Sequence, residues 1–381
     1  MKLGFILFDY FPFGGLQRDC LNIARLSAQR RHTVTIFVRA WQGERPPGIG
    51  VELLGRQGFT NIRRNRHFLK RLASALPGLG LDAVVGFNQA PGLDVYYGAD
   101  PCYAAKVRRL KPAWYRWLPR FRHFEALERA VFQHGNRTEI LLLKATEIPL
   151  YQEFYGTESE RFHVLPPGVA RRAFKEAQRL ETRQRVRREH GWQPEDQLLL
   201  LVGSGFRTKG LDRAIRSLAT LPKRDAPAVR LIVIGRNQPG RFALEARRLG
   251  VADRVHFLGG RHDVPDFMLA ADLLVHPAYS ENTGTVLLEA LTAGLPVLTT
   301  DVCGYAFHVG RADAGIVLPS PFSQDECSRA VAEMLTSERA PSWHANGLAY
   351  AAREDLYTCH ERAADLIEEA ARRKLRSSVS Q

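Results

Sequence analysis

Two glutamates flank a run of small residues in the second half of the chain. Glu281 precedes the run 282–285, and Glu289 lies further along the same segment, 279–289. This segment follows an apolar, strand-like run and opens a predicted helix, whose first N–H groups have no intrahelical partner. Such a helix start binds anions, and a carboxylate on either side can accept hydrogen bonds from a sugar diol. The pattern indicates a sugar-nucleotide site, or only acidic residues that favour the helix dipole.

A second candidate anion site lies in the glycine-rich loop 203–210. The loop follows the apolar run 198–202 and places Arg207 and Lys209 among three glycines. Glycine lets a backbone approach a phosphate closely, and the two cations can meet its charge. The alternative is a solvated loop between a strand and a helix.

The first half of the chain offers a glycine turn. Gly14 and Gly15 stand between the predicted strand 2–8 and a helix that contains Asp19. The glycines lack the GxGxxG spacing of a dinucleotide fingerprint. They favour either close approach to a ligand or a tight turn that needs positive φ.

Two more charged residues follow predicted element ends. Asp100 comes directly after the segment 96–98, and Arg172 follows a Pro-Pro-Gly sequence at 166–168. Open α/β sheets bind ligands at the carboxyl ends of their strands, so both are candidates for the site. For Asp19 and Asp100 the alternative is helix or turn capping.

Strand-like and helical runs alternate along the chain. This alternation predicts parallel sheets covered by helices on both faces. The predicted strands are 2–8, 32–38, 82–87, 138–143, 198–202, 229–235, 254–258, 273–277, 296–300 and 315–318. The predicted domains are 1–167, 168–355 and a C-terminal helix within 356–381 that packs back on the first domain and ends in a frayed tail.

Length and composition agree with two soluble domains. The chain has 381 residues, of which 45% are hydrophobic and 25% charged. The five cysteines are scattered without CxxC spacing, and the apolar N-terminus is too short for a signal peptide, so we expect a cytoplasmic protein without a zinc site. The net charge of +14 is compatible with anionic partners, but no nucleic-acid fold signature is present.

Basic and aromatic residues are interleaved in the segment 101–132. Lys and Arg at eight positions are interspersed with Tyr, Trp and Phe, and His123 lies among them. Such a segment can bind an anionic membrane surface, because its aromatic rings can lie at the level of the lipid headgroups while its lysines and arginines contact the phosphates. The alternatives are a partly buried helical insert and, less favoured, a nucleic-acid stripe.

These motifs together resemble the retaining glycosyltransferases of family 4. Glu281 and Glu289 match that family's spaced glutamate pair, and the loop from Gly203 to Lys209 matches its phosphate loop, with Ser204 where most members carry arginine. The segments 10–19, 85–88, 91–95 and 298–305 narrow the resemblance to lipopolysaccharide core glucosyltransferases over nearly the whole chain.

The resemblance implies the GT-B fold: two Rossmann-like, doubly wound parallel-sheet domains with an interdomain cleft. It implies retaining, metal-independent transfer of a hexose, glucose first, from a UDP-sugar donor to an inner-core heptose of lipopolysaccharide, without a further cofactor. The segment 101–132 would contact the cytoplasmic face of the inner membrane. Asn282 and Thr283 stand where the enterobacterial enzymes have alanines, so a UDP-N-acetylhexosamine transferase is the alternative, followed by a non-catalytic membrane-docked scaffold.

Individual roles follow from the same resemblance. Glu289 would accept the ribose hydroxyls, and Glu281 the 3- and 4-hydroxyls of the sugar. Asp19 and Asp100 would orient the acceptor or the sugar. The remaining diphosphate contacts would be Gly14, Gly15, Arg172, Arg207, Lys209 and the helix start at Asn282, Thr283, Gly284 and Thr285.

Overall fold

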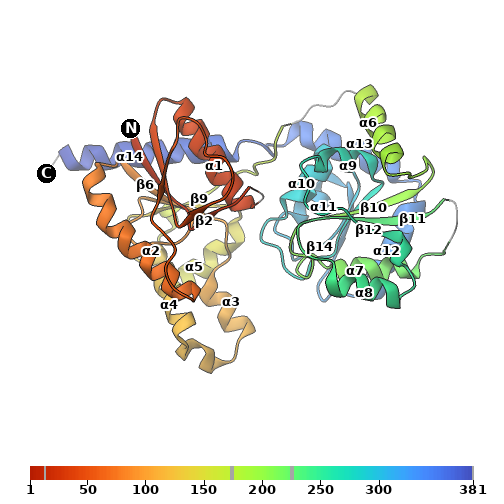
Figure 1. Cartoon of the computed structure of the whole chain (residues 1–381), viewed down its shortest axis with the longest axis horizontal. Coiled ribbons are helices and arrows are strands. Elements are labelled where there is room, and N and C mark those ends of the chain that lie inside the picture. The colour runs from red at the N-terminus through yellow and green to blue at the C-terminus, as the bar shows by residue number, and fades with distance from the viewer. Residues whose placement is uncertain (13, 172–175, 224–226, 380–381) are drawn as a thin grey trace. The chain divides into compact units, whose positions relative to one another are not determined.

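The computed structural model describes residues 1–12, 14–171, 176–223 and 227–379, which form two compact units. The first unit comprises Met1–Pro167 together with Thr358–Gln381, and the second comprises Gly168–Tyr357. Each is built on a parallel sheet with helices packed against it (Figure 1). The predicted α/β class with two Rossmann-like sheets is confirmed.

The sheet of the first unit has seven parallel strands in the order β5-β3-β1-β6-β7-β8-β9. They are β1 (Lys2–Ile6), β3 (Thr33–Val38), β5 (Gly50–Leu53), β6 (Ala83–Gly86), β7 (Val95–Gly98), β8 (Glu139–Leu142) and β9 (Phe162–Val164). A separate parallel pair joins β2 (Asp9–Tyr10) to β4 (Ala40–Trp41). The strand order reverses between β1 and β6, and this switch point is where sheets of this type bind ligands.

The helices of the first unit come from both ends of the chain. They are α1 (Gly15–Gln29), α2 (Asn61–Ala75), α3 (Tyr103–Leu110), α4 (Pro119–Phe132), α5 (Ile148–Tyr155) and α14 (Cys359–Val379). The last of these packs against α1 and β6, and its Ala363 and Ile367 are buried in the same core as β1. Arg30, which follows the last residue of α1, forms ion pairs with Asp365 and Glu368 of α14. The C-terminal helix is therefore part of the first unit.

The second unit has six parallel strands in the order β12-β11-β10-β13-β14-β15. They are β10 (Gln197–Val202), β11 (Val229–Ile234), β12 (Val255–Phe257), β13 (Leu273–His276), β14 (Val297–Thr300) and β15 (Gly315–Leu318). The helices are α6 (Glu176–Glu189), α7 (Leu211–Thr220), α8 (Gly240–Arg248), α9 (Val264–Ala270), α10 (Thr285–Thr292), α11 (Ala306–Ala312), α12 (Gln324–Thr336) and α13 (Ala340–Arg353). Here the order reverses between β10 and β13.

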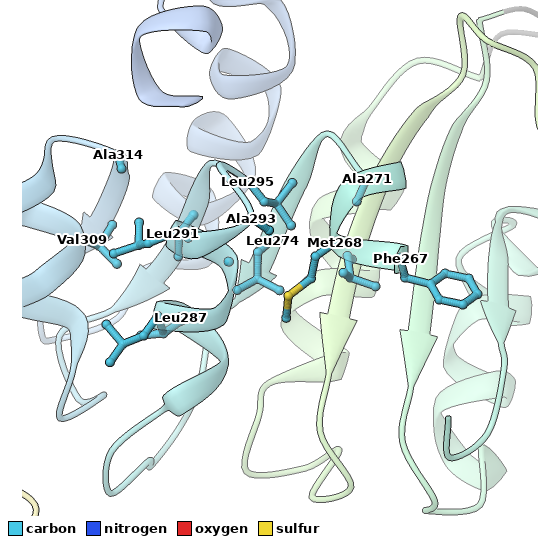
Figure 2. Close-up of a cluster of buried hydrophobic side chains, with 14 of the residues drawn as sticks. Phe267, Met268, Ala271, Leu274, Leu287, Leu291, Ala293, Leu295, Val309 and Ala314 are labelled. Atoms are coloured by element: carbon cyan, nitrogen blue, oxygen red, sulfur yellow. The ribbon is translucent and has the colours of Figure 1, made fainter. Parts of the chain in front are cut away.

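Alternating side chains of β10 fill two cores, one on each face of this sheet. Leu198 and Leu200 belong to one hydrophobic cluster, and Leu199 and Leu201 belong to the other. Successive side chains of a strand point to opposite faces, so a sheet covered on both faces needs an unbroken apolar run. Figure 2 shows part of the first cluster, where Leu274 of β13 packs beside side chains of α9 and α10.

Short elements account for the differences from the predicted strands. All ten predicted strands are present, but β2, β4, β5, β7 and β9 were not predicted. Four of these strands, β2, β4, β5 and β9, are exposed or only partly buried, so they carry no continuous apolar run. The segment around the Pro-Pro-Gly sequence at 166–168 follows β9 directly and is irregular.

Candidate active site

The predicted phosphate loop and the paired glutamates meet at the switch point of the second sheet. Strands β10 and β13 are hydrogen-bonded neighbours, and the two loops follow their carboxyl ends. The amide of Tyr279 donates to the carbonyl of Thr208 at 2.8 Å, which ties one loop to the other. This is the edge at which sheets of this type bind ligands.

Gly210 permits the close contact between these loops. Its φ is +75°, and a Cβ there would lie 2.0 Å from the carbonyl oxygen of Pro277. Any other residue would both strain the backbone and push the two strand ends apart. This glycine therefore helps to set the position of the neighbouring residue, Lys209.

Lys209 and Glu281 form an ion pair across the switch point. The ammonium of Lys209 contacts Oε2 of Glu281, and both side chains are largely buried. Burial lowers the pKa of Lys209, and Cys303 opposes that shift only in part. The other oxygen of Glu281, Oε1, accepts a hydrogen bond from the amide of Asn282 at 3.2 Å. The pair places a cation and a carboxylate together at the ligand-binding edge.

The helix start that was predicted to bind anions is present, slightly later than expected. Helix α10 begins at Thr285, and Gly284 precedes it with φ at +81°. The carbonyl of Thr283 accepts from the amide of Tyr305 at 2.7 Å, which anchors the turn before the helix. Glu289 lies inside α10 and is half-buried. Glu281 therefore precedes the start of α10 and Glu289 lies within the same helix, as predicted.

Two further phosphate contacts were predicted, at Arg207 and Arg172. Arg207 is exposed on the loop after β10, and Thr208 beside it is exposed as well. Arg172 lies outside the described residues. Within those that are described, no group of three or more His, Cys, Asp or Glu side chains is placed to hold a metal ion.

His276 is a member of the site that the sequence did not indicate. It ends β13 and is fully buried, with Nε2 3.4 Å from Oε2 of Glu281. Burial, reinforced by the charge of Lys209, lowers the pKa of His276 to about 3, so its ring is neutral. A lone histidine at the end of an apolar strand carries no spacing signal, which is why it was missed.

The glycine turn of the first unit is present, but positive φ does not explain it. Gly14 has φ of −85° and precedes α1, and Gly15 is its first residue; neither belongs to the glycines with positive φ. The tight-turn interpretation is therefore wrong. A Cβ at Gly14 would meet the amide end of the Gln17 side chain at 1.8 Å, so that flexible side chain would have to move. At Gly15 the space for a Cβ is open.

Asp19 is held by residues from two distant parts of the first unit. Its Oδ2 accepts from the hydroxyl of Tyr97 at 3.0 Å, and Oδ1 lies 3.0 Å from Nε2 of His360. Burial, together with the charge of Asp19, raises the pKa of Tyr97 well above its usual value, so the phenol stays protonated. Because Asp19 lies inside α1, it does not cap the helix, and the capping alternative is wrong for it.

Asp100 lies at a separate pocket of the same unit. The pocket has a volume of about 200 Å³ and is also lined by Asn88, Gln89 and Lys106. Phe8, Tyr103 and Phe124 form aromatic walls. Asp100 lies before Cys102, the residue that caps α3, so it is not the cap of that helix either. Polar groups between aromatic rings suit a carbohydrate.

The basic-aromatic segment forms α3, a 3₁₀ turn at Ala113–Trp117 and α4. Trp114 and Trp117 are 61% and 73% exposed, far more than core aromatics of this protein. His123, predicted to be one of the surface cations, is buried and hydrogen-bonded to Asn65, and burial lowers its pKa. The cationic surface therefore consists of lysines and arginines. None of the described helices has the length and apolar character that crossing a membrane requires.

A buried carboxylate holds this segment on the rest of the unit. Glu128 of α4 accepts from the amides of Tyr103 and Ala104 at 2.7 and 3.0 Å and from the hydroxyl of Tyr155 at 2.6 Å. The two amides are unbonded donors of the first turn of α3, so Glu128 stabilises that helix start. One side of the segment is therefore anchored while the tryptophans face outward.

Comparisons with known proteins agree with this arrangement. Residues 182–355 match the family Glycosyl transferases group 1. The lipopolysaccharide glucosyltransferase WaaG of Escherichia coli (strain K12) is 44% identical over 368 residues, covering 96% of this chain and 98% of that protein. A crystal structure of WaaG gives a TM-score of 0.91 at 42% identity, over 96% of this chain and 99% of that one. The Anabaena protein HepE in complex with UDP-glucose has a TM-score of 0.73 at 18% identity, over 97% and 100% of the chains, a likeness of fold alone.

Proposed function

The chain belongs to the group 1 glycosyl transferases, and we propose that it transfers a hexose, glucose first, from a UDP-sugar to an inner-core heptose of lipopolysaccharide. The observation that carries this proposal is the Lys209–Glu281 pair at the switch point of the second sheet, next to the start of α10. The similarity to WaaG over nearly the full length of both chains supports the choice of acceptor class.

The second unit would supply most of the contacts to the donor. Lys209, the exposed Arg207 and the first amides of α10 would meet the negative charge that grows on UDP as the glycosidic bond breaks. Glu289 would accept the ribose hydroxyls, and Glu281 the hydroxyls of the transferred sugar. Cations and backbone donors of the chain thus supply the charge stabilisation, and the proposal requires no divalent metal.

The configuration at the anomeric carbon would be retained, because the acceptor would attack the sugar from the same face that UDP leaves. The acceptor hydroxyl forms the new bond to the anomeric carbon while its proton passes to an oxygen of the departing phosphate, which balances the charge on UDP. In this scheme no side chain becomes covalently attached to the sugar. Asp19 and Asp100, both in the first unit, would orient the acceptor, Asp19 with the hydrogen bonds from Tyr97 and His360.

The surface of α3, the Ala113–Trp117 turn and α4 would dock on anionic lipid at the cytoplasmic face of the inner membrane. Exposed Trp114 and Trp117 would sit at headgroup level, and the surrounding arginines would contact phosphates. This location suits an enzyme whose acceptor carries a lipid anchor.

A donor-competition assay tests the proposal. The purified protein is given a heptose-terminated, deacylated core acceptor with UDP-glucose, UDP-galactose, UDP-N-acetylglucosamine or UDP-N-acetylgalactosamine, and UDP release and product mass are measured. We expect acceptor-dependent UDP release with a hexose donor. Preference for an acetamido sugar would assign the alternative donor and implicate Asn282 and Thr283. No release with any donor would favour a non-catalytic scaffold.

A further inference from the structure

His276 has a fully buried imidazole whose two nitrogens make no hydrogen bond within the described part of the chain. Its backbone is fixed, because its carbonyl accepts from the hydroxyl of Thr299 at 3.1 Å. Buried polar side chains are nearly always hydrogen-bonded, so an exception needs a reason. The ring cannot be explained as packing alone, since an apolar side chain would fill the same space without an unsatisfied polar group.

The imidazole of His276 lies next to Glu281, and this position gives a reason for a polar side chain at the site. Nε2 lies 3.4 Å from Oε2 of Glu281, the same oxygen that the ammonium of Lys209 contacts. Lys209 also interacts with the thiol of Cys303, which accepts from Thr299 at 3.3 Å and whose pKa is raised by burial. One carboxylate oxygen therefore lies close to both a cation and a neutral ring that could donate to it.

These two partners of Glu281 differ in what else they can bind. In the proposed function, Lys209 also donates to phosphate oxygens of the donor, so it shares its three N–H groups between two anions. His276 faces no such competitor and remains uncharged, because burial and the charge of Lys209 hold its pKa at about 3. A neutral Nε2–H can donate to Glu281 without adding a charge to the site.

We propose that His276 is a positioning residue that holds Oε2 of Glu281 while Lys209 engages the donor diphosphate. Glu281 then keeps its orientation towards the hydroxyls of the transferred sugar. The inference rests on the proposed function, in which Glu281 binds the sugar and not the nucleotide. The inference predicts that His276 contributes to the affinity for a UDP-sugar but not to the affinity for UDP, because UDP lacks the sugar that Glu281 would bind.

Calorimetric titration of UDP-glucose and of UDP measures this property. Replacing His276→Leu removes the donor at nearly constant volume, whereas His276→Gln keeps an N–H group at a similar reach. We expect His276→Leu to weaken UDP-glucose binding roughly 10-fold and to leave UDP binding within about 2-fold, since a hydrogen bond to a charged group is lost. His276→Gln should recover most of the difference.

His308→Leu is the matched control. His308 is also buried in the second unit, but its Nδ1 bonds the hydroxyl of Tyr350 at 2.7 Å. Its replacement should lower stability without changing the ratio of the two affinities. If His276→Leu fails to fold, His276→Asn replaces it, because its shorter amide cannot reach the position of Nε2.

Three outcomes separate the possibilities. An unchanged ratio of UDP-glucose to UDP affinity in His276→Leu, whether neither affinity falls or both fall equally, would overturn the inference. Glu281→Gln tests the premise separately: if this variant leaves the ratio unchanged, the proposed sugar contact itself is wrong. If Glu281→Gln lowers the ratio and His276→Leu does not, only the role of His276 fails.

Discussion

Nε2 of His360 lies 3.0 Å from Oδ1 of Asp19, which joins the C-terminal helix α14 to α1 through a candidate acceptor-side carboxylate. The hydroxyl of Tyr97 binds the other oxygen of the same carboxylate. Three segments that are far apart in the sequence therefore fix one side chain. This arrangement suggests that the C-terminal helix belongs to the machinery for acceptor binding as well as to the core of the first unit.

The first prediction concerns Asp19. Asp19→Asn should lower kcat/KM for the acceptor roughly 10- to 100-fold and leave KM for the donor unchanged, because a charged orienting group is lost. Tyr97→Phe and His360→Gln should have smaller effects in the same direction, roughly 5-fold each. Steady-state kinetics with each substrate varied in turn measures these effects. Wild-type acceptor kinetics in folded Asp19→Asn would rule out the orienting role.

The second prediction concerns the exposed surface around Trp117. Trp117→Ala and Arg120→Glu should both weaken binding to vesicles that contain anionic lipid, the charge reversal by roughly 10-fold at low salt. Sedimentation with vesicles of different anionic content measures the loss. Arg248→Glu, an exposed reversal on α8 of the second unit, serves as the control. Vesicle binding that does not change with anionic lipid content or salt concentration would contradict the electrostatic part of the proposal.

The third prediction follows from the neutral histidine at the site. The pKa of His276 is about 3 in the folded protein, below the roughly 6.5 of an unfolded chain. Its contribution to stability is therefore fully present above pH ~6.5 and is lost as the pH falls towards the folded value, by about 2 kcal/mol at pH ~5. Urea unfolding at neutral and acidic pH should show a weaker acid dependence for His276→Leu than for the wild type. Parallel curves for the two proteins would show that the residue does not titrate in this way.

The fourth prediction concerns metal ions. The proposed charge stabilisation comes from Lys209, Arg207 and the amides of α10, so turnover should survive an excess of chelator within about 2-fold, far less than loss of a charge-stabilising group would cost. Added Mg²⁺ or Mn²⁺ should not raise it. Loss of activity with the chelator and recovery with a metal would show that these groups of the protein do not suffice to stabilise the departing UDP.

The sequence predicted those parts of the fold that local patterns determine. The run at Leu198–Val202 indicated a strand buried on both faces, and its side chains do alternate between two cores. Strands β5 and β9 were missed because they are partly exposed and lack a continuous apolar run. The meeting of the loop after β10 with Glu281 was predictable, because parallel neighbours place both loops at one edge.

The remaining parts of the site depend on contacts that no local pattern encodes. His360 reaches Asp19 only because α14 returns to the first unit, and the position of His360 near the end of the chain gives no sign of it. His276 has the sequence context of an ordinary core residue, and its importance appears only when Glu281 lies beside it. The burial of His123 likewise depends on α2 packing against α4 through Asn65.

The most direct test of the central claim is the turnover of Lys209→Ala with UDP-glucose and a deacylated, heptose-terminated core acceptor. If Lys209 stabilises the departing UDP, turnover should fall by ~10²–10³ while the far-ultraviolet circular dichroism of the variant stays that of the wild type. The ion pair with Glu281 makes Glu281→Gln a useful companion, with a loss expected for sugar binding and not for UDP binding. Near-wild-type turnover of a folded Lys209→Ala variant would contradict the assignment of this switch point as the donor site.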